Sequence, residues 1–331
     1  MAESDHLTPL PWQRTQWVRL HDARDQGRLA HAVLLQGVAG LGVDRFAQCF
    51  AQSLLCRTPR PDRTACGLCA ACRQFAQGVS ADYRALTILK DKTQITVDQV
   101  RELIEFLSLT QGSASSKVAV IEPAEAMNIN ASNSLLKTLE EPPGAVVLML
   151  VAANSGRLPA TIRSRCQLIK FPQPDPAEAH AWLAGHGVAE PELALRLAHG
   201  APCRALEQDN SAERQAFREA LDAAVGALKR RPGLGEFGKC SSNIGLPRLV
   251  QLQMSLLRDL LRCQVGASDA SFENPVVIGE LRTLCRTLNY VELSSAYDRC
   301  VTMLGMLNHP LSPDLSRDRV LVDWIDLVAR H

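Results

Sequence analysis

The hydrophobic positions of the first half of the chain fall into short continuous runs, separated by segments with helical spacing. Continuous apolar runs bounded by turn residues are typical of strands covered on both faces of a parallel sheet. The predicted strands are Ala32–Gln36, Ala81–Leu89, Lys117–Ile121, Val146–Ala153 and Gln167–Phe171. One helical pattern, Thr15–Gly27, precedes the first strand, and others lie between the strands, at Asp44–Leu55, from the Thr96–Gln99 capping box onward, at Ser132–Glu141 and at Thr161–Cys166. This alternation predicts an α/β fold in which helices flank a parallel sheet.

The remainder of the chain carries helical spacing throughout. Asp175 followed by Pro176 is a typical helix start, and two short helices are predicted at Pro176–Gly185 and Glu190–His199. From Ser211 onward, apolar residues recur at intervals of three and four, without a strand pattern among them. The pattern therefore predicts three parts: an α/β domain at residues 1–171, a small helical domain at 172–210 and an all-α domain at 211–331.

Composition and charge narrow the class of protein without identifying it. Hydrophobic residues make up 46% of the chain and charged residues 21%, which is typical of a soluble globular protein. The formal net charge of +1 gives no overall attraction to nucleic acid or to a membrane surface. No apolar stretch is long enough to span a bilayer, and the polar start Met1–His6 lacks the apolar core of a signal peptide. We therefore expect a cytoplasmic protein that does not enter a membrane.

Four of the eleven cysteines lie close together in the sequence. Cys56, Cys66, Cys69 and Cys72 follow the second predicted helix with the spacing C-x9-C-x2-C-x2-C. Gaps of two residues are typical of tetrahedral zinc sites, and four sulfur ligands leave no position open for catalysis. The spacing predicts a structural Zn²⁺ module at residues 56–72, with four free thiols or an iron–sulfur cluster as the alternatives. The odd total and the scattered positions of the other cysteines indicate reduced thiols.

A glycine-rich loop joins the first predicted strand to the next helix. The segment G-V-A-G-L-G contains Gly37, Gly40 and Gly42, in the strand–loop–helix context of a phosphate-binding loop. A working loop continues with Lys and then Ser or Thr, whereas this chain continues with Val43 and Asp44. The outer phosphates therefore lack an ammonium partner, and a carboxylate that repels them replaces a metal-binding hydroxyl. We expect a degenerate loop that does not bind ATP; a plain glycine turn before a helix is the alternative.

Two further segments carry a resemblance to a known family. Leu135–Pro143 reads L-L-K-T-L-E-E-P-P, and Ser164, Arg165 and Cys166 form an S-R-C triplet before the last predicted strand. The order of the predicted elements and these two motifs resemble those of the AAA+ clamp-loader ATPases of bacterial replication. The resemblance implies a RecA-like parallel sheet with an inserted zinc module, followed by a small helical lid. For the C-terminal part, where only the helical character is shared, it implies a collar domain through which subunits assemble.

The resemblance also implies that the nucleotide site of this chain is impaired. Active members carry adjacent Asp and Glu after the third strand, whereas this chain reads Glu122 and Pro123, and proline cannot act as a base. Asn154 stands where the family senses the terminal phosphate. Cys203 stands where family motors place an arginine of the lid. The resemblance therefore implies a subunit without ATPase activity of its own.

Arg165 still matches the family motif, although the residues of the chain's own nucleotide site do not. In this family, the arginine of the S-R-C triplet projects toward the ATP of the neighbouring subunit, where a guanidinium can fork onto phosphate oxygens. A surface arginine or a local ion pair is the alternative. The resemblance thus implies a non-hydrolysing, hetero-oligomeric subunit of the DNA polymerase III clamp loader. Its implied partners are the motor (gamma/tau) and delta subunits and, through the complex, the sliding clamp and primed DNA.

Two other functions are compatible with parts of the sequence. The first is a clamp-loader motor that binds or hydrolyses ATP with a divergent phosphate loop, which Val43, Asp44 and Pro123 disfavour. The second is a zinc-stabilised DNA-binding module outside any clamp loader. The net charge near zero disfavours the second function, because DNA-binding domains usually concentrate positive charge.

Overall fold

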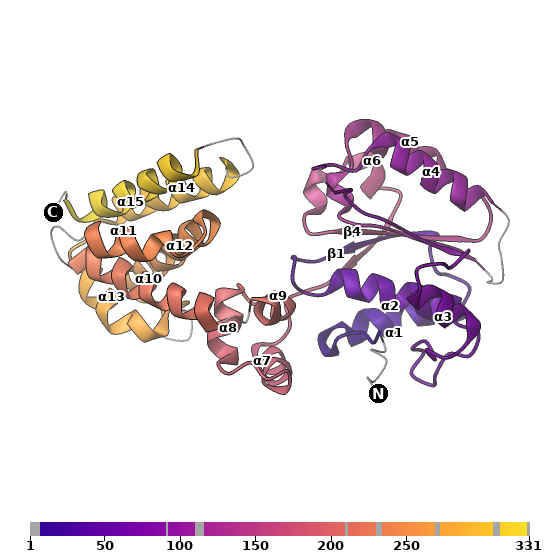
Figure 1. The fold of residues 1–331 in the computed structure, drawn as a ribbon, viewed down its shortest axis with the longest axis horizontal. Helices are drawn as coiled ribbons and strands as arrows, with labels where there is room; N and C mark the ends of the chain where they lie inside the picture. The colour runs from indigo at the N-terminus through magenta and orange to yellow at the C-terminus, as the bar shows by residue number, and fades with distance from the viewer. Residues whose placement is uncertain are drawn as a thin grey trace. The chain divides into compact units, whose positions relative to one another are not determined.

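The computed structural model describes residues 7–90, 92–109, 116–208, 211–229, 234–268, 272–306 and 312–329. It divides into two compact units, Met1–Gln208 and Asp209–His331. The first unit contains a sheet with helices on both faces, and the described residues of the second form helices only (Figure 1). Each unit has its own hydrophobic core.

Five parallel strands form the sheet of the first unit, in the order β2-β3-β4-β1-β5. The strands are β1 Ala32–Gln36, β2 Tyr83–Leu86, β3 Lys117–Ile121, β4 Val146–Ala152 and β5 Gln167–Lys170. Each strand lies within its predicted run, which confirms the prediction of a parallel α/β sheet. The run predicted at Ala81–Leu89 shortens to β2 because this strand lies at an edge and pairs with β3 alone.

The central strand β1 shows why the apolar runs are continuous. Val33 and Leu35 belong to the core on one face of the sheet, whereas Ala32 and Leu34 belong to the core on the other. Successive side chains of a strand point to opposite faces, so a strand covered twice needs apolar residues at every position. The strand β4 is buried at each of its positions for the same reason.

The helices that pack on the sheet form two groups, one on each face (Figure 1). One group consists of α1 Arg14–Asp25, α2 Val43–Leu55 and α3 Ala70–Ala76, and the other of α4 Val97–Ser108, α5 Ile129–Glu140 and α6 Ala160–Arg163. The predicted capping box begins α4, where the Thr96 N–H donates to Gln99 Oε1 at 3.1 Å. Asn128 begins α5 by accepting from the Ala131 N–H at 2.8 Å, so this helix starts before the predicted Ser132.

Three short helices complete the first unit: α7 Pro176–Gly185, α8 Pro191–Leu197 and α9 Pro202–Glu207. Asp175 begins α7 as predicted, because its carboxylate accepts from the Ala177 N–H at 2.8 Å. The three helices share a small core that contains Ala179, Leu183 and Ala198. Residues 172–208 belong to the same compact unit as the sheet. Their assignment as a separate lid domain stays a prediction.

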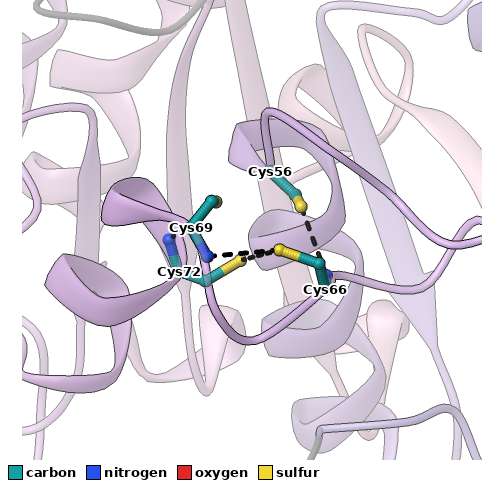
Figure 2. Close-up of side chains that lie close together, drawn as sticks. All are labelled: Cys56, Cys66, Cys69 and Cys72. Carbon is teal, nitrogen blue, oxygen red and sulfur yellow. Dashed lines mark hydrogen bonds between the residues drawn. The ribbon is translucent and has the colours of Figure 1, made fainter.

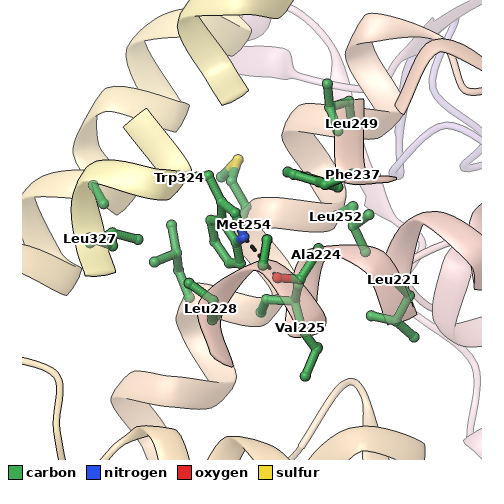
Figure 3. Close-up of a cluster of buried hydrophobic side chains, with 14 of the residues drawn as sticks. Leu221, Ala224, Val225, Leu228, Phe237, Leu249, Leu252, Met254, Trp324 and Leu327 are labelled. Carbon is green, nitrogen blue, oxygen red and sulfur yellow. Dashed lines mark hydrogen bonds between the residues drawn. The ribbon is translucent and has the colours of Figure 1, made fainter. Parts of the chain in front are cut away.

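The second unit consists of α10 Ser211–Lys229, α11 Leu234–Ser242, α12 Leu246–Gln264, α13 Ile278–Leu284, α14 Tyr290–Met306 and α15 Pro313–Ala329. The helix α10 contributes Leu221, Val225 and Leu228 to the core, at the spacing of three and four expected from Ser211 onward (Figure 3). Trp324 of α15 is also buried there, and its indole Nε1 donates to the Ala224 carbonyl at 3.0 Å. Among the described residues of both units, we find no helix that is long and apolar enough to cross a membrane.

The parallel sheet brings the candidate nucleotide-site residues to the end of the sheet where its strands terminate. The carboxyl ends of β1, β3 and β4 lie side by side, because these strands are adjacent and parallel. The glycine loop Gly37–Gly42 follows β1, Glu122 follows β3, and Asn154 lies shortly after β4. In open α/β sheets, ligands bind at this end.

Candidate functional site

The four clustered cysteines converge on one point from two segments of the chain (Figure 2). Cys56 directly follows α2 and Cys66 lies on the loop after it, whereas Cys69 and Cys72 lie at the start of α3. Their sulfur atoms all lie within 4.8 Å of one another, and Cys66 Sγ lies 3.9 Å from Cys72 Sγ. Zn–S bonds of ~2.3 Å at tetrahedral angles place sulfur atoms about 3.8 Å apart. The arrangement therefore fits a four-coordinate metal ion such as Zn²⁺.

Hydrogen bonds to sulfur prepare the cluster for a cation. The Cys66 N–H donates to Cys56 Sγ at 3.3 Å, and the Cys69 N–H donates to Cys66 Sγ at 3.3 Å. The Thr58 hydroxyl donates to Cys66 Sγ as well, and this bond is the largest cause that lowers the pKa of Cys66 to about 5. Burial acts in the opposite direction and raises the pKa of the Cys72 thiol. A metal ligand must be a thiolate, and these hydrogen bonds favour the thiolate form of Cys66.

The loop between Cys56 and Cys66 is fastened to α1. The guanidinium of Arg63 contacts Asp22 at 2.6 Å and Asp25 at 3.1 Å. The indole Nε1 of Trp17 donates to the Asp62 carbonyl at 3.0 Å. These contacts join the cysteine module to the sheet-bearing part of the first unit, although the module's own apolar core is small.

Residues at the start of α9 pack against the predicted phosphate loop. The Cys203 N–H, at the start of α9, donates to the Gly40 carbonyl at 3.0 Å. A methyl group built on Gly40 would lie 2.6 Å from the Cβ of Arg204, and one built on Gly42 would lie 3.1 Å from Cys203 Sγ. Gly40 and Gly42 both have positive φ, at +90° and +70°, which explains why glycine is needed at these turns. Thus α9 packs directly on the glycines.

A buried glutamine also holds the loop by hydrogen bonds. Gln13 is fully buried at the end of η1 Pro11–Gln13, and its amide donates to the carbonyls of Leu41 at 3.0 Å and Gly42 at 2.8 Å. Neighbouring Trp12 donates to the Leu41 carbonyl at 3.1 Å, and its ring meets that of Trp182 in α7, edge to face, at 5.3 Å. Sequence reasoning missed Gln13, because no local pattern reports a partner almost thirty residues away.

The residues that replace the usual phosphate and metal partners are unfavourable to an anion. The side chain of Val43 is buried, with 4% exposed, and Asp44 lies in the first turn of α2. The pKa of Glu122 is raised to about 7, first by burial and then by the negative charges of Asp44 and Glu125. Asp44 thus puts a negative charge where a working site has a metal-binding hydroxyl, and this charge also acts on the carboxyl of Glu122.

Glu125 and Asn154 organise the loop after β4. One oxygen of Glu125 accepts from the N–H groups of Ala153 at 2.9 Å and Asn154 at 3.3 Å. The Asn154 side chain accepts from the Gly156 N–H at 3.0 Å and begins the short helix η3 Ser155–Arg157. Both polar groups therefore serve backbone positions. The tie from Glu125 joins segments far apart in sequence, and sequence reasoning did not find it.

Arg165 lies on the surface after α6, and a network within the chain holds it. Its Nε donates to Glu140 Oε1 at 2.8 Å, and its Nη1 donates to the Thr161 carbonyl at 3.0 Å. The side chain of Arg165 is 35% exposed and that of Glu140 is 50% exposed. Arg163 makes a weaker contact, from Nη1 to the Ser155 carbonyl at 3.4 Å. The guanidinium of Arg165 is thus partly exposed to solvent and also held in one orientation. Its partner Glu140 was not predicted from the sequence.

Comparisons with known proteins place these features in a family. A family model described as DNA polymerase III, delta subunit, matches residues 12–175. The chain is similar to DNA polymerase III subunit delta′ of Pseudomonas aeruginosa, with 36% identity over 77% of this chain and 78% of that protein. It is also similar to subunit tau of Escherichia coli, with 28% identity over 87% of this chain and 48% of that protein. A solved gamma subunit-related protein of Thermotoga maritima shares 16% identity over 93% of this chain and 99% of that chain, with a TM-score of 0.48.

Proposed function

Since this chain belongs to the family of delta′ subunits of the DNA polymerase III clamp loader, we propose that it acts there as a non-hydrolysing subunit that supplies Arg165 to the ATP site of a neighbouring motor subunit. The proposed partners are gamma/tau motors and a delta subunit. Through the complex, the chain would help load the sliding clamp onto primed DNA in DNA replication. For the all-α unit we propose the role of a collar through which the subunits assemble.

The observation that carries this proposal is a contrast within the first unit. The glycine loop is packed by Arg204, Cys203 and Gln13 of its own chain, which supports a site without nucleotide. Arg165, at the same time, is partly exposed and held at the surface. An arginine that reaches a neighbour's phosphates stabilises the charge of the transition state, and in other nucleotidases this contribution reaches about 10³–10⁵ in rate.

We also propose that the cysteine module holds one structural Zn²⁺ through Cys56, Cys66, Cys69 and Cys72. The convergent sulfur atoms support this proposal. The ion would supply a crosslink between the end of α2 and the start of α3. It would have no part in ATP hydrolysis, because four protein ligands complete its coordination.

The decisive experiment compares Arg165→Ala with Arg163→Ala in a reconstituted clamp loader. We expect Arg165→Ala to lower DNA-stimulated ATP turnover while the complex still assembles, as size-exclusion chromatography would report. Arg163→Ala removes the same charge from the same turn of chain and should leave turnover near that of the wild type. Unchanged turnover with Arg165→Ala would mean that this arginine is structural.

The nucleotide proposal has a separate test on the isolated chain. We expect neither ATP binding nor hydrolysis with magnesium and ATP at up to about millimolar concentration, because the loop lacks an ammonium group and α9 packs against its glycines. Binding without turnover would make the chain a nucleotide-sensing subunit. Sustained hydrolysis would replace our proposal with that of a motor with a divergent loop.

A further inference from the structure

The guanidinium of Arg165 has most of its hydrogen-bond donors engaged within the chain. Nε donates to Glu140 Oε1 at 2.8 Å, and Nη2 lies 2.5 Å from the same oxygen. Nη1 donates to the Thr161 carbonyl at 3.0 Å and lies 3.4 Å from Ser164 Oγ. A guanidinium carries five N–H donors in a fixed fork. The edge formed by Nε and Nη2, one of its two-pronged edges, is therefore turned to a carboxylate of α5.

These partners act on Arg165 in different ways. Thr161 and Ser164 hold Nη1 from the turn of chain that also carries Arg165, so they orient the guanidinium locally. Glu140 comes from the last residue of α5 and contributes a negative charge. A carboxylate and a phosphate compete for the same fork, because both accept two parallel N–H groups. Orientation by Thr161 and Ser164 can persist without Glu140, whereas the competition cannot.

We propose that Glu140 is a latch for the arginine that acts in trans: it occupies the Nε–Nη2 fork until the phosphates of a neighbour's nucleoside triphosphate displace it. This inference rests on the proposed function of Arg165. The latch is weak enough to open, because half of the Glu140 side chain and a third of the Arg165 side chain are exposed to solvent. The latch therefore raises the ATP concentration at which Arg165 engages the neighbour's phosphates.

The test uses Glu140→Gln, which keeps the shape and an oxygen acceptor but removes the charge. In the reconstituted complex, we expect the half-saturating ATP concentration to fall by about 2- to 5-fold, which corresponds to the strength of an exposed ion pair. The maximal turnover should stay the same, because Arg165 reaches the same position once the latch is open. Glu141→Gln is the matched control: the neighbouring carboxylate is exposed, and among the described residues we find no ion pair that includes it.

A second experiment tests whether the effect of Glu140 passes through Arg165. In complexes that carry Arg165→Ala, Glu140→Gln should no longer change the half-saturating ATP concentration. An equal change with and without Arg165 would overturn the latch, because the effect would then not pass through the arginine. A fall in maximal turnover with Glu140→Gln would also overturn it and assign Glu140 an orienting role.

The failure of the latch and that of the proposed function can be distinguished. If Arg165→Ala lowers turnover but Glu140→Gln leaves the ATP dependence unchanged, the latch is wrong and the function in trans stands. If Arg165→Ala leaves turnover unchanged, the arginine does not act in trans, and the latch falls with it.

Discussion

The cysteine cluster and the glycine loop lie at opposite ends of α2, and they show how differently a binding motif can be preserved. At the cysteine cluster, four donor atoms point to a common centre, with distances that suit an ion between them. At the glycine loop, the backbone has positive φ at Gly40 and Gly42, and Arg204 and Cys203 of α9 pack against these glycines. The two regions therefore differ in their surroundings: sulfur atoms converge at the cysteines, whereas residues of α9 pack against the glycines.

The largest effect should come from removing the metal ligands. Cys69→Ser combined with Cys72→Ser should abolish the binding of about one zinc per chain. It should also lower the free energy of unfolding by on the order of 5 kcal/mol, because binding energy at a structural zinc site is folding energy. Elemental analysis and thermal unfolding measure the two quantities.

The matched control for the zinc experiment is Cys263→Ser combined with Cys285→Ser. These partly exposed cysteines belong to the second unit and lie outside the cluster. They should leave the metal content unchanged. A folded wild-type chain that contains no zinc would contradict the prediction.

The next effect tests whether the glycine loop is packed. Gly40→Ala should lower the free energy of unfolding by about 2–4 kcal/mol, since the new methyl group meets Arg204 and the left-handed backbone is strained. Gly144→Ala is the control, because Gly144 has a similar φ of +85° but no atom within 4 Å of the new methyl group. It should cost only the backbone strain of about 1–2 kcal/mol. Equal losses in chemical denaturation would mean that α9 does not pack on the loop.

A smaller, pH-dependent effect is expected at Glu122. Its pKa rises from 4.5 to about 7 on folding, chiefly through burial, so the folded chain disfavours the ionised form. The stability associated with protonated Glu122 is present below about pH 4.5 and is lost as the pH rises through about 7.

The variant Glu122→Gln tests the direction of this pH dependence. The stability of this variant relative to the wild type should increase by about 1–2 kcal/mol between pH 5 and pH 8, in denaturant titrations at each pH. Asp44→Asn should reduce the dependence, because the charge of Asp44 contributes to the raised pKa of Glu122. A relative stability that falls with pH would contradict this assignment.

The smallest effect is expected for the ion pair at the surface. In the isolated chain, Arg165→Ala and Glu140→Gln should each change the free energy of unfolding by less than about 1 kcal/mol, because solvent screens the partly exposed pair. This result matters for the comparison, since it would separate a role in the complex from a role in stability. A loss of about 3 kcal/mol with either variant would indicate a structural pair instead.

The sequence by itself determined the features that depend on neighbours along the chain. Continuous apolar runs placed β1 and β3 at their observed bounds, because a strand covered on both faces needs an apolar residue at each position. The spacing of the four cysteines predicted their convergence, since short turns bring such residues together. The sequence also showed Val43 in place of the Lys of a phosphate-binding loop, because the residues of that motif are contiguous along the chain.

Only the tertiary structure decided what surrounds these features. Arg204 covers Gly40, Gln13 holds Gly42, Glu125 fastens the end of β4, and Glu140 holds Arg165. Each pair joins residues from different elements, so their contact depends on how the helices pack on the sheet. Hydrophobic periodicity specifies that an element is buried on one face, but it does not specify which polar side chain of another element lies opposite. For this reason the sequence revealed the motifs, but not the packing of α9 on the glycine loop or the partner of Arg165.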